Sequence, residues 1–273
     1  MDIVINAEIA LIPENNTEIP TQGNFYHNLL SCLGYPNDAP PVADLLCKYH
    51  DLEGEWLVVS PIHWQATHND AMIIASGTQL GLSEQDSQLW FKAFKAFVAS
   101  ENMRVHYHDA QTWLLQYEDK PLLTAKPVHL LHHKSMMPEL EVLDNTLFWQ
   151  RFFTESQMFF SAHVLNKNRT DLYPINGVWL WGNGKLEAKT QTQLICADSD
   201  LLKLADILST KVGDAYSLPQ ATKNSILLYA NLNQNTRLVL QKQLQKNTIR
   251  WYWNNLAYQS KPKSWISRFM ERV

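Results

Sequence analysis

The chain has 273 residues, of which 45% are hydrophobic, so it can form one large domain or two small ones around a sizeable core. Its formal net charge of -4 is spread along the chain, which argues against a broad basic surface and against nucleic acid as a partner. The sequence contains no run of about 18 apolar residues, and its first residues lack a basic start and a small-residue cleavage site. Neither a membrane span nor a secretory signal is therefore predicted.

Cysteine usage points to a reducing compartment. Cys32, Cys47 and Cys196 are an odd number of residues at wide spacing, which fits neither a disulfide framework nor a zinc site. Each is predicted to be a small buried apolar group, and we expect the protein to be cytoplasmic.

Predicted strands and helices alternate along the chain. In chain order they are a strand over 2–12, helices over 25–35 and 40–50, strands over 55–67 and 70–76, a helix over 84–100, strands over 103–109 and 112–118, and a helix over 146–168. There follow a short strand that ends in turn residues over 177–184, a strand over 192–197, a helix over 198–209, strands over 225–232 and 249–260, and a tail helix over 264–273. This alternation predicts an α/β fold with a mixed sheet and flanking helices.

The helix over 84–100 carries the clearest local signals. Ser83 and Asp86 form a capping-box pattern at its start. Its apolar side chains share one helical face and are predicted to face the core; they are Leu89, Trp90, Ala93, Phe94 and Phe97.

Three groups of histidines are candidate metal or acid–base sites. In SPIHWQATHND, His63 and His68 would face opposite sides of one strand unless the turn before Asp70 brings His68 back. The alternative for this segment is a strand with a polar turn.

In HYHD, His106 and His108 share a strand face, which is a good chelating geometry, and Asp109 follows them. A third ligand is not evident from the sequence, and the alternative is a solvated strand edge. The group His129, His132 and His133 lies in an irregular stretch and is predicted to be exposed.

Common nucleotide and hydrolase motifs are missing. The sequence has no Gly-x-Gly-x-x-Gly, no P-loop and no Gly-x-Ser-x-Gly elbow. A dinucleotide-binding fingerprint, a Walker phosphate cradle and a serine hydrolase of the elbow type are therefore not predicted.

The segment HVLNKNRTDLYPINGVWLWGNG, residues 163–184, concentrates polar and aromatic side chains. If the preceding helix continues, His163, Asn166 and Arg169 lie roughly on one face, and Arg169 offers a fork suited to phosphate or carboxylate. Asn176 can donate and accept hydrogen bonds, and Trp181 is a large aromatic. The alternative is a helix end capped by cations, followed by core tryptophans.

Residues 163–188, HVLNKNRTDLYPINGVWLWGNGKLEA, resemble the His–Asn–Arg–Asn and Trp-Leu-Trp-Gly-x-Gly region of archaeal-type cofactor-independent phosphoglycerate mutases. The segments 39–49, 55–94 and 192–214 are similar to other parts of that family, so the likeness covers about 36–235. An uncharacterised proteobacterial group of phosphoglycerate mutase-like, regulatory proteins is more similar still. The family belongs to the alkaline-phosphatase superfamily and transfers phosphate with a Ser or Thr nucleophile and two metal ions.

The resemblance implies a truncated alkaline-phosphatase-like core over 1–54 and 186–273, with an inserted α+β domain over 55–185. The sequence departs from the family where metal ligands are expected. After the first strand only Glu8 or Glu14 is available, and LNQNTRLVLQ, residues 232–241, has neither Asp nor His. Because two divalent ions need several carboxylate or imidazole ligands, we expect no metal cofactor and no mutase activity.

The predicted function is therefore binding, in a regulatory role, of a small phosphorylated or carboxylated metabolite, a protein partner, or both. The predicted ligand-binding residues are His63, His68, His163, Asn166, Arg169, Asn176 and Trp181. The alternative is an active phosphomutase or phosphatase that uses Mn or Zn at a rebuilt site. Its predicted residues are His63, His68, Asp70, His106, His108 and Asp109.

Overall fold

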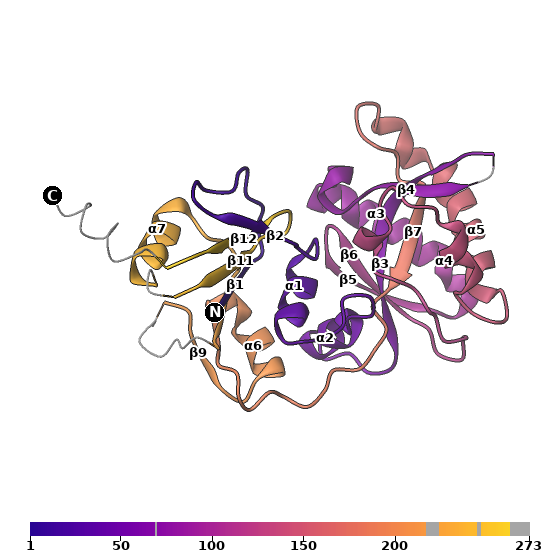
Figure 1. Ribbon diagram of the computed structural model, residues 1–273. Coiled ribbons are helices and arrows are strands. Elements are labelled where there is room, and N and C mark those ends of the chain that lie inside the picture. Colours follow the sequence, from indigo (N-terminus) through magenta and orange to yellow (C-terminus); the bar gives the residue numbers. More distant parts are fainter. Residues whose placement is uncertain (69, 217–223, 245–246, 263–273) are drawn as a thin grey trace. The chain divides into compact units, whose positions relative to one another are not determined.

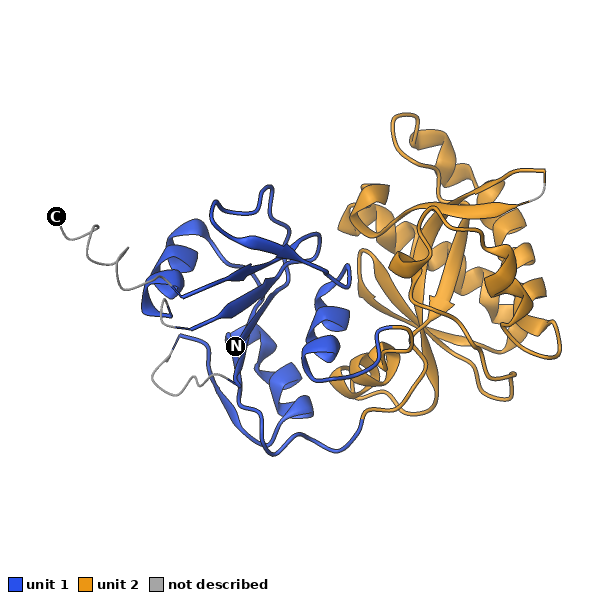
Figure 2. Cartoon of the chain, in the orientation of Figure 1, with its two compact units in different colours: residues 1–37, 187–273 blue, residues 38–186 orange. Residues whose placement is uncertain are grey.

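The computed structural model describes residues 1–68, 70–216, 224–244 and 247–262. The chain forms two compact units, one of residues 1–37 and 187–273 and the other of residues 38–186 (Figure 2). The tail predicted as a helix over 264–273 lies outside the described residues. Each unit is built around its own sheet.

The unit of residues 1–37 and 187–273 contains a mixed seven-stranded sheet in the order β2-β12-β11-β1-β10-β8-β9 (Figure 1). Its elements are β1 (Asp2–Ile5), β2 (Thr17–Ile19), α1 (Phe25–Cys32), β8 (Ile195–Ala197), a 3-10 turn (Ser199–Leu201), α6 (Leu202–Leu208), β9 (Val212–Asp214), β10 (Ile226–Tyr229), α7 (Gln234–Gln243), β11 (Ile249–Tyr252) and β12 (Ala257–Ser260). The strands β11, β1, β10, β8 and β9 are parallel, whereas β12 pairs antiparallel with β11 and β2.

The first strand is shorter than the sequence predicts. It ends at Ile5, whose partner on β10 is Tyr229, and the Asn6 N–H closes the ladder on the Tyr229 carbonyl at 2.9 Å. Beyond this point the backbone pairs with no strand of the described ranges, so the apolar residues up to 12 do not extend the sheet. The sheet is central to the core, since Ile3, Leu227 and Trp251 are fully buried.

The unit of residues 38–186 contains an antiparallel five-stranded sheet in the order β4-β3-β6-β5, with β7 paired to β3. Its strands and α-helices are α2 (Val42–Tyr49), β3 (Trp56–Ala66), β4 (Ala71–Ser76), α3 (Glu84–Val98), β5 (Arg104–Asp109), β6 (Thr112–Gln116), α4 (Met137–Glu141), α5 (Phe148–Ser161) and β7 (Gly177–Trp181). Short 3-10 helices are η1 (Gly77–Leu80), η2 (Ala99–Glu101), η3 (Val128–Leu130) and η4 (Val164–Asn168).

Helices α2, α3 and α5 of this unit pack against β3, β5 and β7. Ser83 caps α3 by accepting the Asp86 N–H at 3.1 Å, as predicted. The predicted apolar face is only partly correct: Trp90 and Phe94 are buried, but the Leu89 side chain is 48% exposed. The buried face is rotated because Ser87, which accepts the indole N–H of Trp113, lies inside it.

The helix α5 ends at Ser161, seven residues before the predicted end at 168. Its inner face packs on β7, where the rings of Phe153 and Trp179 stack at 4.7 Å between centroids. Aromatic side chains therefore supply much of the core of this unit.

The chain is thus a mixed α/β protein whose sheets are flanked by helices, as the sequence predicts. The second unit begins at residue 38, and α2 belongs to it through its packing on β3. The identification of the two units with a reduced phosphatase core and an inserted domain stays a prediction. Within the described ranges, no helix has the length and apolar character needed to cross a membrane.

Candidate functional site

The segment between α5 and β7 is a compact loop rather than a continued helix. At His163 the backbone leaves the helical conformation, and the His163 ring caps η4 by accepting the Leu165 N–H on Nδ1 at 3.3 Å. The expectation that His163, Asn166 and Arg169 share one α-helical face is therefore wrong. A helix end is followed here by a separately capped 3-10 turn.

Asn166 holds this loop closed. Its side-chain amide donates to the carbonyls of Phe160 and Ile175, both at 2.9 Å, and its Oδ1 accepts the Ile175 N–H at 2.9 Å. One side chain thus joins the end of α5 to Ile175, which lies two residues before β7. These bonds occupy both sides of the Asn166 amide with backbone groups.

Asn176 acts in the same way on the sheet. It accepts the Trp64 N–H on Oδ1 and donates to the Trp64 carbonyl, both at 2.8 Å. The pairing of β3 with β7 ends at Ile62 and Gly177, so the Asn176 amide stands in for a strand partner just beyond that end.

Arg169 is the buried charge of the loop, with 7% of its surface exposed. Its Nε donates to the Tyr173 carbonyl at 3.0 Å, and Nη2 donates to the Leu80 carbonyl. Nη1 has no partner among the described residues, and no Asp or Glu in that part of the chain forms an ion pair with it. Burial lowers the pKa of Arg169, and the charge of Asp86 raises it.

His63 lies beside the same loop. Its Nδ1 is 2.9 Å from the Pro174 carbonyl, which can only accept, so Nδ1 carries the proton and the Nε2 lone pair of the neutral ring is left available. The ring stacks on Tyr173, with 5.3 Å between centroids. Tyr173 thereby links His63 to Arg169.

Tyr173 is a residue that the sequence analysis missed. Its ring is 45% exposed, and its carbonyl accepts from Arg169. The available signal was its place between Arg169 and Pro174 in a polar loop, where an aromatic side chain has no strand or helix face to occupy.

The other predicted ligand-binding residues lie elsewhere. His163 packs against Trp90 and Phe159, at 5.1 and 5.5 Å between ring centroids. Trp181 is 3% exposed and donates to the Ser60 hydroxyl at 2.9 Å. His68 is exposed in the turn between β3 and β4. Hence the loop brings together Arg169 and His63, and the ligand-binding role of all seven residues stays a prediction.

The residues of the alternative metal site fall into two groups. Asp70, next to His68, accepts the Ala71 N–H at 2.7 Å and the Ser135 hydroxyl at 2.8 Å. His106 and His108 lie on β5 instead. Over the ranges that the structure describes, no three His, Cys, Asp or Glu side chains are arranged so that they could hold a metal ion.

His106 and His108 nevertheless gain a third histidine that their spacing does not reveal. His50 follows α2, and its Nε2 is 2.8 Å from His108 Nδ1, while its ring lies 4.4 Å from that of His106. The other ring nitrogen of His108 is 3.5 Å from an Asp109 carboxylate oxygen. Desolvation, followed by the charge of His106, lowers the pKa of His108 to about 4.

The prediction of exposed loop histidines at 129–133 is correct for His133 only. His132 is half-buried, and its Nε2 is 2.7 Å from the Ser76 hydroxyl oxygen. The loop lies along β4, where His132 bridges to Ile73, and this pairing draws the imidazole inward. Burial is the main cause that lowers its pKa, and the charge of His133 adds to it.

Comparisons with known proteins give one distant likeness. No protein-family model matches the chain, and neither does any curated protein. Among solved structures, the chain is similar to a cofactor-independent phosphoglycerate mutase from Thermoplasma acidophilum DSM 1728, at 12% identity and a TM-score of 0.34, over 94% of this chain and 88% of that one. The site described above rests on the contacts of its own residues and not on this likeness.

Proposed function

We propose that the protein binds a small anion bearing a phosphate or carboxylate group at Arg169, and that it does so without phosphoryl transfer. The observation that carries the proposal is a buried guanidinium whose hydrogen-bond partners are two neutral carbonyls. Buried charges in proteins are normally paired with an opposite charge, because desolvation is costly. An anionic ligand would supply the missing charge.

The contacts around Arg169 hold its guanidinium group in one orientation. Two of its nitrogens are held by backbone carbonyls of Tyr173 and Leu80, which orients the guanidinium plane and leaves Nη1 as the free donor. A guanidinium binds phosphate and carboxylate oxygens with directional, charge-assisted hydrogen bonds. The Tyr173 ring, on which His63 stacks, is the aromatic neighbour of this anion site.

The non-catalytic part of the proposal rests on the sequence. The family that residues 163–188 resemble needs two metal ions, and the segments expected to hold them lack most carboxylate and imidazole side chains. Binding without chemistry fits a regulatory role, in which occupancy by a metabolite is the signal.

Thermal unfolding with added ligand tests the proposal. Inorganic phosphate, glycerol 3-phosphate and malonate are added to the full chain, with and without Mn²⁺. We expect at least one anion to raise the melting temperature saturably in the wild type and in Arg169→Lys, but not in Arg169→Gln. Arg104→Gln is the matched control, because the Arg104 side chain is 72% exposed in a surface ion pair.

An equal anion effect in the wild type and Arg169→Gln would refute the proposal. If Arg169→Gln does not fold, Tyr173→Ala serves in its place, since the Tyr173 backbone carbonyl that holds Arg169 is retained. The enzyme alternative would be favoured by two results together. The anions would stabilise Tyr173→Ala and Arg169→Lys as much as the wild type, and the protein would hydrolyse a phosphate ester in the presence of Mn²⁺.

A further inference from the structure

A second surface, away from the Arg169 loop, has the features of a binding site. A cavity of about 180 Å³ lies between η2 and the first half of α5, lined by Glu101, Phe148, Arg151, Phe152 and Glu155. All five residues belong to the unit of residues 38–186. The volume suits a ligand of few heavy atoms.

The floor of the cavity is formed by one face of α5, which carries both charged and aromatic side chains. On α5, the four lining residues are spaced at i, i+3, i+4 and i+7, which places them on one helical face. Phe152 is buried, and its ring lies 5.7 Å from that of Phe97. The start of this helix is anchored by Asp144, whose carboxylate accepts the N–H groups of Phe148 and Trp149.

The charges around this floor sum to zero but are not all paired with each other. Lys120 lies 3.4 Å from a Glu101 carboxylate oxygen, with its Nζ 5.1 Å from the centre of the Phe148 ring. Arg151 and Glu155 are one helical turn apart, yet neither has an ion-pair partner within the described part of the chain. The order with the cation first is the less favourable one for pairing along a helix.

We infer that this cavity binds a free α-amino acid with an apolar side chain. The Arg151 guanidinium would take the carboxylate, Glu155 would take the ammonium group, and the rings of Phe148 and Phe152 would cover the side chain. Because the surrounding charges cancel, a simple anion or a simple cation gains no net attraction there. A zwitterion satisfies both unpaired charges at once. This inference goes beyond the proposed function and does not depend on Arg169.

Calorimetric titration of the full chain with L-leucine tests the inference. 4-Methylpentanoate and isoamylamine serve as ligands that keep one charge each, and all three ligands are also titrated into Arg169→Gln so that carboxylate binding at Arg169 is removed from the comparison. We expect saturable leucine binding with a dissociation constant in the range of roughly 0.1–10 mM, as for other ligands of this size. Each single-charge ligand should bind about tenfold more weakly, because one charge-assisted hydrogen bond is lost.

Substitutions of Arg151 and Glu155 test which side chain binds which end of the amino acid. Arg151→Gln and Glu155→Gln should each weaken leucine binding about tenfold, whereas Arg151→Lys should retain most of it. The matched control Arg104→Gln and the variant Arg169→Gln should bind leucine like the wild type. An absence of saturable binding in the wild type, or binding by Arg151→Gln and Glu155→Gln as tight as that of the wild type, would overturn the inference and leave the Arg169 proposal untouched.

Discussion

Two polar clusters in the unit of residues 38–186 satisfy their hydrogen bonds in different ways. In the loop 163–176, the side-chain amides of Asn166 and Asn176 bond to backbone groups. Near β5, His50 and His108 bond to each other, and the His106 ring packs at a tilt against that of His50. The first cluster is neutral at any ordinary pH, whereas the second can take up protons.

This difference shows that the partners of a polar side chain decide whether it fixes the backbone, responds to pH or remains available to a ligand. An amide that replaces a strand or loop partner fixes backbone geometry and has little capacity left for a ligand. Imidazoles that pack on one another stabilise the fold while they are neutral. Protonation of two of them places positive charges within a few ångströms, and their repulsion destabilises the cluster. Arg169 differs from both, since its positive charge is permanent and forms no ion pair with a carboxylate in the described part of the chain.

The largest effect is expected from the amide cluster. Asn166→Ala removes three hydrogen bonds and leaves backbone groups of Phe160 and Ile175 without partners. We expect the free energy of unfolding in urea to fall by about 3 kcal/mol. Asn168→Ala, at an exposed position of the same loop, is the control and should change it by less than about 0.5 kcal/mol. Similar values for both variants would show that Asn166 does not hold the loop closed.

The histidine cluster should make stability depend on pH. The pKa of His108 in the folded chain is about 4, below its ordinary value of 6.5, so the unfolded chain binds the extra proton between these values. The free energy of unfolding should therefore fall as the pH drops from about 6.5 to about 4, by at most roughly 3 kcal/mol. The difference in unfolding free energy between the wild type and His108→Gln, measured across this range, isolates the contribution. A difference that does not vary with pH would contradict this account of the cluster.

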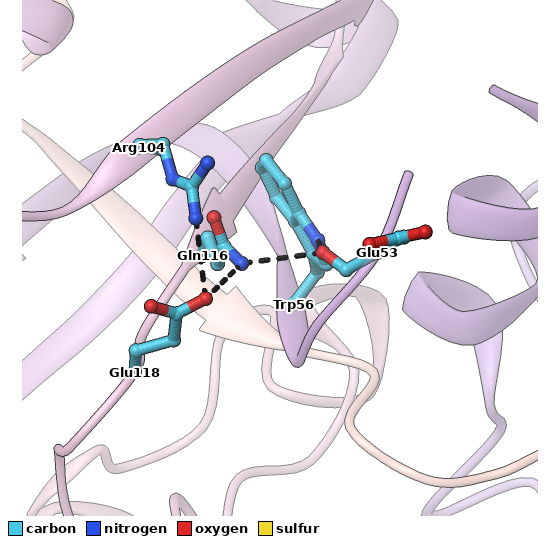
Figure 3. A network of polar contacts seen from close by, with 5 residues as sticks. All are labelled: Glu53, Trp56, Arg104, Gln116 and Glu118. Carbon is cyan, nitrogen blue, oxygen red and sulfur yellow. Dashed lines mark hydrogen bonds and ion pairs between the residues drawn. The ribbon is translucent and has the colours of Figure 1, made fainter. Parts of the chain in front are cut away.

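A third polar cluster lies at the ends of β3, β5 and β6 (Figure 3). Its solvent-exposed members should contribute little to the free energy of unfolding. Arg104 donates to Glu118 at 3.2 Å, but both side chains are mostly exposed, whereas Gln116, which also donates to Glu118, is buried. Arg104→Ala should cost no more than about 0.5 kcal/mol in urea unfolding, because an exposed ion pair contributes little. A loss of unfolding free energy close to that of Asn166→Ala would show that solvent exposure does not explain why the two clusters differ in their contribution to stability.

The sequence predicted elements whose signals are local. The Ser83 cap, the strands β5 and β6 and the apolar strand β7 all follow from short-range patterns, and the structure has them. The end of α5 was missed because its break depends on Asn166 and on the ring packing of His163, which are tertiary contacts.

The sites were harder to predict for the same reason. His106 and His108 were found from their spacing, but His50 lies more than fifty residues away and meets them only through α2 packing on β3. Arg169 was found from its chemistry. Its partner carbonyl at Leu80 carries no side-chain signal, and Tyr173 was overlooked. Sequence patterns name the polar residues, and only the fold tells which of them remain unpaired.

The central claim is that Arg169 offers a positive charge to an anion. A titration with inorganic phosphate, followed through the nitrogen-15 signals of the arginine side chains, tests it most directly. The account predicts saturable shifts of the Arg169 guanidinium signals, with those of the exposed Arg104 and Arg151 nearly unchanged. Shifts of equal size at all three arginines, or none at Arg169, would contradict it.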